Sequence, residues 1–175
     1  MEWKRNRINE EGELEFEGED VNGKRWNGKG KEYDKYGNLE FEGEYLNGEK
    51  NGKIKEYDED DVIIFEGEYF IGNKNGKGKE YYYNGELKFE GEYLNGERNG
   101  KGKEYNYNGE LVFEGEYLNG KKWNGKRKEY HDNGLLKFER EYLNGKKNGK
   151  GKQYNEEGEL EFEGEYLNYH NNHIL

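Results

Sequence analysis

Carboxylates, lysines and tyrosines are the side chains that could do chemistry here, because the chain contains no Ser, Thr or Cys. Those three missing residues supply most enzymatic nucleophiles. The remaining candidates recur at equivalent positions all along the chain, so none of them marks a unique site. Recurring carboxylate pairs are typical of a solvated, lysine-paired surface rather than of the acid–base pair of a glycosidase. We therefore predict no catalytic residue, no enzyme activity and no small-molecule substrate.

Two segments contain residues that could hold a metal ion. His170 and His173 have a spacing compatible with a metal if they lie on a helix, but they offer only two ligands. The acidic run Asp58–Asp61 replaces a plain turn and lacks the glycine and the distant glutamate of an EF-hand loop. The Gly-x-Gly pairs precede no predicted helix, so they do not form a phosphate-binding loop. We predict no metal site and no cofactor.

One row of glutamates is a candidate partner-binding site. Its members occupy the same place in successive repeats: Glu32, Glu56, Glu80, Glu104 and Glu129, with Gln153 in the sixth place. The strand pairing that the Asn-Gly hairpin turns predict sets each of them on the aromatic face, opposite a phenylalanine. One interpretation is that local bending near the turns exposes the row to water. The other is that carboxylates beside a ladder of rings bind a partner segment rich in Lys or Arg.

A tandem repeat must position these side chains, because the string F-E-G-E-Y returns at a nearly fixed interval. The phenylalanines of this string are separated by 24 residues, or by 25 where Trp26 or Trp123 is inserted. A period of this length is typical of repeat architectures, in which each unit is one supersecondary element. The inserted tryptophans indicate a turn that tolerates one additional residue.

The repeat also defines the expected domains and core. We predict an N-terminal capping strand and partial repeat over 1–19, tandem repeats over 20–166 and a C-terminal cap or tail over 167–175. Trp3 and Tyr169–Leu175 depart from the repeat pattern and are expected to cover its ends. The core is expected to consist of the aromatic and glycine positions of the repeats: Phe41, Gly43, Tyr45, Phe65, Gly67, Tyr69, Phe89, Gly91, Tyr93, Phe113, Gly115, Tyr117, Phe138, Tyr142, Phe162, Gly164 and Tyr166.

Alternation of side-chain type along each repeat predicts β-strands. Leu87 and Phe89 share one face of such a strand, whereas Lys88 and Glu90 share the other. The pair Asn84-Gly85 lies between two predicted strands, and Asn-Gly is the strongest short signal of a two-residue type I′ hairpin turn. We therefore predict an all-β fold, an elongated antiparallel β-meander of about seven tandem 24-residue hairpin repeats in a single repeat domain.

The Asn84-Gly85 turn also predicts which residues face each other. The expected pairs are Lys79 with Glu90, Lys77 with Glu92, Gly78 with Gly91 and Gly76 with Tyr93. Opposite charges at facing positions contribute roughly 0.2–1 kcal/mol per pair, and a slipped register would move every side chain to the wrong face. We predict a single register throughout the chain. The ring of Tyr93 is expected to lie over Gly76, where no Cβ obstructs it.

The repeat resembles the MORN repeat, in which two aromatics flank a glycine and further glycines follow. In the best-matching unit these positions are Phe89, Gly91, Tyr93, Gly96, Gly100 and Gly102. Departures from the pattern are Ile54, Arg127 and Arg140, each of which stands where a glycine is expected. The phrase YNGELKFEGEYLNG also resembles the variant MORN repeats of antitoxin-like bacterial proteins. The resemblance implies a twisted meander of hairpins and a role in scaffolding, dimerisation or membrane association.

Composition narrows the kind of partner. A net charge of −11 makes nucleic acid an unfavourable partner and disfavours an anionic membrane. No apolar run is long enough for a transmembrane helix and no secretory signal is recognisable, so we expect an intracellular, cytoplasmic protein. The leading hypothesis is a non-catalytic repeat scaffold that mediates protein–protein interaction or self-assembly. The alternatives are a phospholipid tether at a membrane surface and an antitoxin-like neutralising protein.

Overall fold

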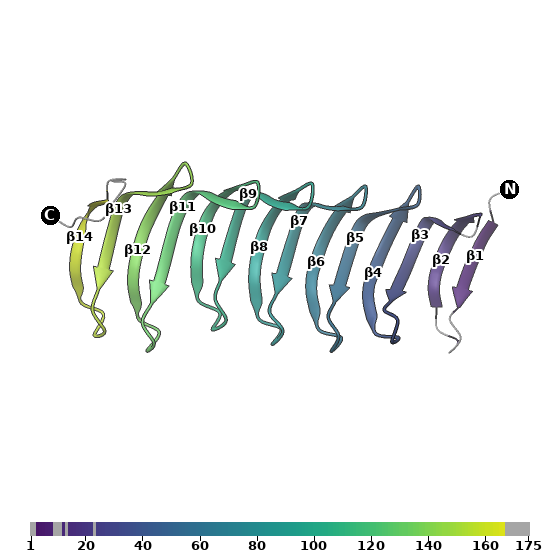
Figure 1. Cartoon of the computed structure of the whole chain (residues 1–175), viewed down its shortest axis with the longest axis horizontal. Helices are drawn as coiled ribbons and strands as arrows, with labels where there is room; N and C mark the ends of the chain where they lie inside the picture. Colours follow the sequence, from purple (N-terminus) through teal and green to yellow (C-terminus); the bar gives the residue numbers. More distant parts are fainter. Residues whose placement is uncertain (1–2, 9–11, 13, 23, 167–175) are drawn as a thin grey trace. The chain divides into compact units, whose positions relative to one another are not determined.

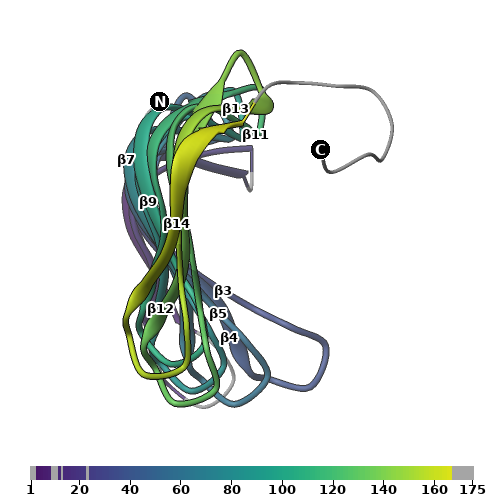
Figure 2. The same cartoon turned by 90° about the vertical axis from the view of Figure 1, so that its left-hand side faces the viewer.

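The computed structural model describes residues 3–8, 12, 14–22 and 24–166, and every regular element in this part of the chain is a β-strand (Figure 1). The all-β prediction is therefore confirmed. The chain divides into two compact units, Met1–Glu97 and Arg98–Leu175. Successive strands within each unit pair antiparallel in sequence order, as expected for a meander. Figure 2 looks onto the last strand, which curves along its length.

The strands are short and nearly equal in length. The first unit contains β1 (Trp3–Ile8), β2 (Leu14–Val21), β3 (Lys24–Tyr33), β4 (Leu39–Leu46), β5 (Glu49–Tyr57), β6 (Ile63–Phe70), β7 (Asn73–Tyr81) and β8 (Leu87–Leu94). Strand β9 (Glu97–Tyr105) begins at the boundary, and the second unit continues with β10 (Leu111–Leu118), β11 (Lys121–Tyr130), β12 (Leu136–Leu143), β13 (Lys146–Tyr154) and β14 (Leu160–Tyr166).

The predicted pairing within the hairpin β7–β8 is confirmed. The facing residues are Gly76 with Tyr93, Lys77 with Glu92, Gly78 with Gly91 and Lys79 with Glu90. The turn that produces this pairing differs from the prediction. The amide of Gly85 donates to the carbonyl of Tyr82 over 2.8 Å, and the amide of Tyr82 donates to the carbonyl of Glu86 over 2.9 Å. The turn is therefore one residue longer than predicted, and a bulge beside Tyr81 restores the register.

Type I′ turns do occur, but at the other connection of each repeat, where the sequence reads L-N-G. Asn47 and Gly48 both have positive φ, 53° and 83°, as this turn type requires. The dipeptide Asn-Gly is common to both connections, so it could not distinguish them. Ile71 occupies the asparagine position of one L-N-G turn with a φ of 48°, which is strained for a β-branched residue.

The prediction of a single register is wrong at the two connections that contain an inserted tryptophan. Phe41 faces Glu56 across β4–β5, but Phe16 faces Gly30 across β2–β3. The pairing β10–β11 is displaced in the same way, with Phe113 facing Arg127. A displacement of two residues keeps every side chain on its face, because side chains alternate with a period of two. The aromatic face is therefore continuous within each unit despite the change.

The core of each unit is a ladder of rings on one face of the sheet. Phe41, Phe65, Phe89 and Phe113 are at most 2% exposed. Phe65 packs edge-on against Tyr69 of its own repeat and Tyr93 of the next, with ring centroids 6.1 Å and 5.5 Å apart. Edge-on packing at these distances is the favoured aromatic geometry. Tyr69 and Phe138 are only half-buried, Phe162 is 46% exposed, and the side chain of Tyr166 is outside the described part.

The repeat needs its glycines for two separate reasons. The sequence predicted one of them, room for a tyrosine ring, but assigned it to the wrong glycine. A Cβ on Gly78 would lie 2.7 Å from the ring of Phe65 and 3.1 Å from that of Tyr93, so this glycine makes room for rings. Gly76 instead has a φ of 86° in the bulge that follows the type I′ turn, and a Cβ there would meet the carboxylate of Glu68. The ring of Tyr93 therefore lies over Gly78 rather than Gly76.

Two departures from the repeat pattern are accommodated differently. Ile54 replaces the ring-covered glycine and is itself buried in the cluster with Phe41 and Tyr45. Arg140 replaces a glycine between aromatics, and its guanidinium lies 4.4 Å from the centre of the Phe138 ring. Trp3 lies in β1, but its side chain is outside the described part, as are Tyr169–Leu175, which include His170 and His173. The predicted terminal covers stay predictions.

Candidate functional site

The glutamate row lies where the strand pairing predicted it. Glu56 faces Phe41 on one neighbouring strand and Phe65 on the other, and Glu104 faces Phe113. The remaining members have the same kind of neighbour: Glu32 faces Phe41, Glu80 faces Phe89, Glu129 faces Phe138 and Gln153 faces Phe162. Each carboxylate therefore leaves the sheet on the aromatic face, near the hairpin turns.

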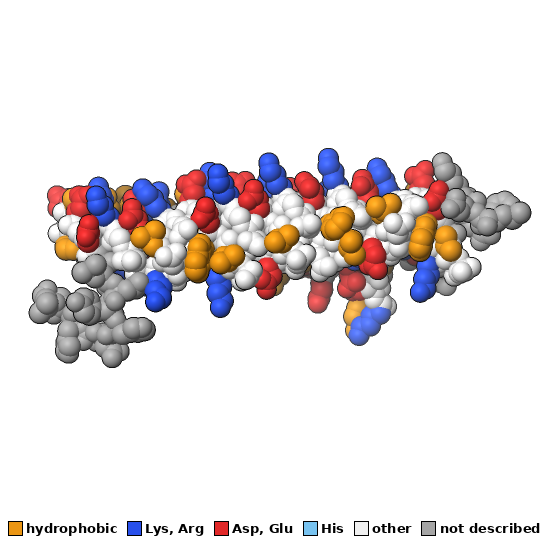
Figure 3. All heavy atoms as spheres, turned by 90° about the horizontal axis from the view of Figure 1, so that it is seen from above, with side chains coloured by type: hydrophobic (Ala, Val, Ile, Leu, Met, Phe, Trp, Pro, Cys, Tyr) orange, Lys and Arg blue, Asp and Glu red, His pale blue; other side chains and the backbone are white. Residues whose placement is uncertain are grey.

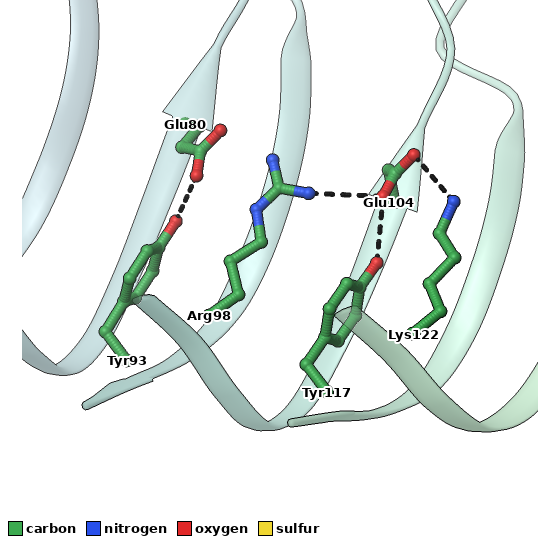
Figure 4. Close-up of polar contacts among 6 residues, drawn as sticks. All are labelled: Glu80, Tyr93, Arg98, Glu104, Tyr117 and Lys122. Atoms are coloured by element: carbon green, nitrogen blue, oxygen red, sulfur yellow. Dashed lines mark hydrogen bonds and ion pairs between the residues drawn. The ribbon is translucent and has the colours of Figure 1, made fainter. Parts of the chain in front are cut away.

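Tyrosine hydroxyls bind most of these carboxylates. The hydroxyl of Tyr45 donates to Glu32 over 2.5 Å, and that of Tyr93 donates to Glu80 over 2.6 Å (Figure 4). Tyr69 binds Glu56 in the same way, and Tyr117 binds Glu104 over 2.9 Å. Each donor is thirteen residues after its acceptor. The second aromatic of the repeat thus has a polar role in addition to its packing.

A lysine from the following repeat lies beside the carboxylate at three of these sites, those of Glu32, Glu56 and Glu104. The ammonium of Lys50 lies 2.8 Å from the carboxylate of Glu32, and that of Lys74 lies 2.9 Å from Glu56. Each ammonium also lies over the ring beside its glutamate, since Lys50 is 3.7 Å from the centre of Phe41. Cation–π contact adds about 0.5–1 kcal/mol at exposed sites and more where water is excluded.

The site at Glu104 shows the arrangement most completely. Its carboxylate accepts a hydrogen bond from the Tyr117 hydroxyl, and it pairs with Lys122 at 2.9 Å and with Arg98 at 3.1 Å (Figure 4). Its side chain is 23% exposed. Neither Lys122 nor Arg98 is more exposed than the carboxylate, so these charges are substantially shielded from solvent. A glutamate with the tyrosine and the cations that bind it is called a glutamate–tyrosine site from here on.

These contacts shift the acid–base behaviour of both partners. Burial alone would raise the pKa of Glu104, but the hydrogen bond and charge of Lys122, together with Tyr117 and Arg98, outweigh it and hold that pKa below the ordinary value. The pKa of Glu32 is lowered for the same reasons, against burial, by Lys50, Tyr45 and Arg25. Burial and the bound carboxylate raise the pKa of Tyr117 far above that of free tyrosine.

Glu129 is the least typical member of the row. Arg127 stands where other repeats have a glycine, and its Nε lies 3.2 Å from the Glu129 carboxylate on the same strand. The glutamate row is neither simply exposed to water by local bending nor an open acidic surface, because most of its carboxylates bind cations of the chain itself. Its role in binding a basic partner stays a prediction.

The opposite face of the sheet carries the predicted columns of lysine and glutamate. Lys79 lies 3.7 Å from Glu66, and Lys152 lies 3.3 Å from Glu163. The hydroxyl of Tyr81 also donates to Glu66 over 2.6 Å. Exposed pairs of this kind contribute little individually, about 0–1 kcal/mol. This face is a solvated polar surface without a distinctive cluster.

An exposed apolar side chain precedes each type I′ turn. The members, named here the leucine row, are Leu46, Phe70 and Leu94 in the first unit and Leu118 and Leu143 in the second. They are 41–55% exposed. Figure 3 looks onto these turns and shows hydrophobic side chains over them, bordered by lysines and acidic residues. Consecutive members within a unit are two strands apart, a separation of roughly 10 Å.

Two family models match the chain in the region of these repeats. The model of the MORN repeat matches residues 41–53 and 89–110, and that of the MORN repeat variant matches 74–95, 123–144 and 147–168. Together they span more than half of the chain, and the resemblance seen in the sequence is confirmed. The chain belongs to the MORN repeat family. A search of curated proteins found no match.

The MORN pattern therefore has a physical meaning in this protein. Its two aromatics are the buried phenylalanine and the tyrosine that binds the glutamate, as Phe113 and Tyr117 illustrate. Sequence reasoning placed the glutamates correctly but missed the tyrosine hydroxyls and the lysines that bind them. It also missed the leucine row, although an apolar residue directly before the two residues of each such turn was a regular signal in the sequence.

A further feature of the MORN repeats is an open hollow of about 610 Å³ at the hairpin ends of the first unit, lined by Asp34, Glu40, Asp58, Tyr57 and Tyr81 among others.

The Asp58–Asp61 run forms an ordinary turn, in which the Asp58 carboxylate accepts hydrogen bonds from the amides of Asp60 and Val62. Within the described residues, no group of three or more His, Asp or Glu side chains is arranged to hold a metal ion. A search of the same residues found no helix that could cross a membrane.

Proposed function

We propose that this MORN repeat protein is a non-catalytic scaffold that binds protein partners through the leucine row. The observation that carries the proposal is the exposure of an apolar side chain at the same place in successive repeats. Contiguous exposed apolar surface on a soluble protein is a common mark of an interaction site. The bordering charges supply the polar rim that such interfaces have around an apolar centre.

Repetition gives these contacts a particular value. A partner that contacts several members of the row gains avidity, since each further contact forms within an existing complex. The spacing of roughly 10 Å within a unit is fixed by the strand separation. The row therefore presents its side chains at regular, preorganised intervals.

The absence of Ser, Thr and Cys from the sequence supports a role without catalysis. The glutamate–tyrosine sites recur from repeat to repeat and bind lysines of the chain itself. We assign them a structural role within the scaffold. Binding of a basic partner along the glutamate row is a second prediction, and charge reversal of Glu80 and Glu104 tests it directly.

A matched pair of double variants tests the leucine row. Leu46→Asn with Leu118→Asn removes one member from each unit, and Leu14→Asn with Leu135→Asn removes equally exposed leucines that lie outside the row. Cross-linking in the native source, followed by quantitative mass spectrometry, measures which proteins each variant retains. We expect the row variant to lose its partners about tenfold, which corresponds to about 1.4 kcal/mol of binding free energy, while the control keeps them.

Two results would overturn the proposal. One is equal partner recovery with the row variant and the control. The other is flotation of the protein with anionic phospholipid vesicles, abolished by the row variant alone, which would identify the row as a membrane contact instead.

A further inference from the structure

We propose that Asn148 is a site of spontaneous deamidation, the reaction that converts asparagine to aspartate and isoaspartate. The fold directs the amide nitrogen of Gly149 at the side chain of Asn148, and water is the only co-reactant. The inference goes beyond the proposed scaffold role and does not depend on it. Three observations carry it: a hydrogen bond between the two residues, their place in a bulge, and matched Asn-Gly pairs that the fold holds differently.

The chemistry is ring closure between an asparagine side chain and the backbone that follows it. The amide nitrogen of Gly149 loses its proton and attacks Cγ of Asn148, so that an N–Cγ bond forms. The Cγ–Nδ2 bond then breaks, and Nδ2 leaves with one proton as ammonia. Water opens the resulting cyclic imide at either of its carbonyls, which gives aspartate or isoaspartate. Glycine obstructs this attack least, because it has no Cβ.

At Asn148 the two reacting groups already lie against each other. The amide of Gly149 donates a 3.0 Å hydrogen bond to Oδ1 of Asn148. Because Oδ1 and Cγ belong to the same carbonyl group, this bond holds the attacking nitrogen beside the carbon that it attacks. Both residues are half-buried, so the surrounding structure restricts their motion. Holding reacting groups in contact removes much of the entropic part of a reaction barrier.

Asn148 also lies where the backbone is least constrained by its neighbour. In the pairing of β13 with β12, Lys147 faces Tyr142 and Gly151 faces Arg140, and the register shifts between these two pairs. The residues between them form a bulge, in which the regular ladder of hydrogen bonds to the other strand is disrupted. The backbone at this position can therefore adjust as the ring closes.

The turn of the same hairpin provides a contrast. Asn144 and Gly145 are followed by a lysine, as Asn148 and Gly149 are, so the local sequence Asn-Gly-Lys is the same. The amide of Gly145, however, donates to the carbonyl of Trp123 over 2.9 Å. The nitrogen that would attack Asn144 must first break this hydrogen bond.

A second contrast comes from Asn124, which occupies the corresponding place in the preceding repeat. It too begins an Asn-Gly-Lys sequence. Its Nδ2 donates to the carboxylate of Glu116 over 2.9 Å, and its Oδ1 accepts the amide of Asn144 over 2.9 Å. The side chain of Asn124 is thus bound at both ends to other residues. Any difference in reactivity among the three asparagines must therefore come from the fold.

The products would change the bulge in two ways. Both products add a carboxylate, and isoaspartate also adds a methylene group to the backbone. Glu141 already lies against this segment, since its carboxylate accepts the amide of Lys150 over 2.9 Å. Like charges at short range repel each other. We therefore expect modified chains to unfold at a lower denaturant concentration than unmodified ones.

Mass spectrometry of the folded, full-length chain tests the proposal with internal controls. The protein is incubated at mildly alkaline pH and then cleaved after glutamate at mildly acidic pH. One product, 142–156, contains both Asn148 and Asn144, and another, 117–129, contains Asn124. Fragment masses identify which asparagine has exchanged its amino group for a hydroxyl group. We expect Asn148 to be converted at least about tenfold faster than either control, as the cost of breaking a hydrogen bond predicts.

Unfolding and one variant separate the effect of the fold from that of the sequence. In guanidinium chloride the three rates should become similar, because each asparagine is followed by Gly-Lys. The variant Asn148→Gln, whose longer side chain would have to close a larger ring, should lose the signal at this position. Circular dichroism verifies that this variant retains its strands.

Two outcomes would overturn the inference. One is conversion of Asn144 or Asn124 as fast as that of Asn148 in the folded chain. The other is an equal lead of Asn148 in guanidinium chloride, which would show that the fold does not direct the reaction. Both measurements use the purified chain, so they are independent of partner binding by the leucine row.

Discussion

The hydroxyl of Tyr93 donates a 2.6 Å hydrogen bond to the carboxylate of Glu80, thirteen residues earlier in the chain. The same relationship connects Tyr45 with Glu32 and, in the second unit, Tyr117 with Glu104. The tyrosine therefore stabilises its repeat in two ways. Its ring packs on a phenylalanine, and its hydroxyl binds a carboxylate. This dual role leads to the first prediction.

Replacing Tyr117 with phenylalanine should destabilise the protein while the aromatic packing stays. A hydrogen bond to a charged group is worth about 1.5–3 kcal/mol, and Glu104 would lose one such donor. Urea unfolding measures the difference. Tyr83→Phe, at a residue that is 77% exposed in a turn, is the control and should unfold like the unmodified chain. Equal loss in both variants would contradict the assigned role of the hydroxyl.

The lowered pKa of Glu104 predicts a loss of stability in acid. Because the folded-state pKa lies below the ordinary value of 4.5, its contribution is complete above that value and is lost as the pH falls through the folded-state pKa. Glu104→Gln should show a smaller decline in unfolding free energy between neutral and strongly acidic pH. Glu157→Gln, in an exposed turn, should decline like the unmodified chain; an identical decline in Glu104→Gln would refute the prediction.

The strained Ile71 predicts a stabilising substitution. Its φ of 48° is the left-handed conformation that asparagine occupies in the equivalent turns, and its side chain is 58% exposed. A left-handed conformation costs most residues about 1–2 kcal/mol, and less for asparagine. Ile71→Asn should raise the unfolding free energy by about 1 kcal/mol. The reverse change, Asn47→Ile, should lower it by a similar amount, and thermal unfolding of both variants would reveal any departure from this symmetry.

The two kinds of glycine predict two kinds of cost. Gly78→Ala would set a Cβ 2.7 Å from the ring of Phe65, and such overpacking costs about 1–3 kcal/mol. Gly85→Ala meets nothing within 4 Å but retains a φ of 81°, so only backbone strain of about 1–2 kcal/mol applies. Near-ultraviolet circular dichroism should change in Gly78→Ala alone, because only that variant displaces rings. A changed spectrum in Gly85→Ala as well would argue against this separation.

Local pattern in the sequence was sufficient for the strands and for the pairing of Lys79 with Glu90, because charge alternation and hairpin length constrain both. It was insufficient for the turns, since the Asn-Gly dipeptide occurs in a three-residue turn at Asn84 and in a type I′ turn at Asn47. The change of register beside Trp26 depends on how an inserted residue is absorbed, and spacing does not reveal that.

The glutamate row shows the same division between what spacing can and cannot predict. Strand parity placed Glu104 on the aromatic face, as observed. Its binding to Tyr117 and Lys122 depends on side-chain reach across two neighbouring strands, which alternation does not encode. The leucine row was equally visible in the sequence, but its exposure follows from its place beside a turn.

The separation between the contacting residues has a consequence for how this chain can change its length. A glutamate takes its hydroxyl from thirteen residues downstream and its ammonium from eighteen, both shorter than the 24-residue period. Duplication or deletion of one whole period in the gene therefore returns every carboxylate to an equivalent donor. A change of another size between the glutamate and its lysine would alter one of these separations, whereas the inserted Trp123 lies just beyond Lys122 and leaves them unchanged. Selection can thus alter the length of the array in steps of one repeat, without redesigning a single contact.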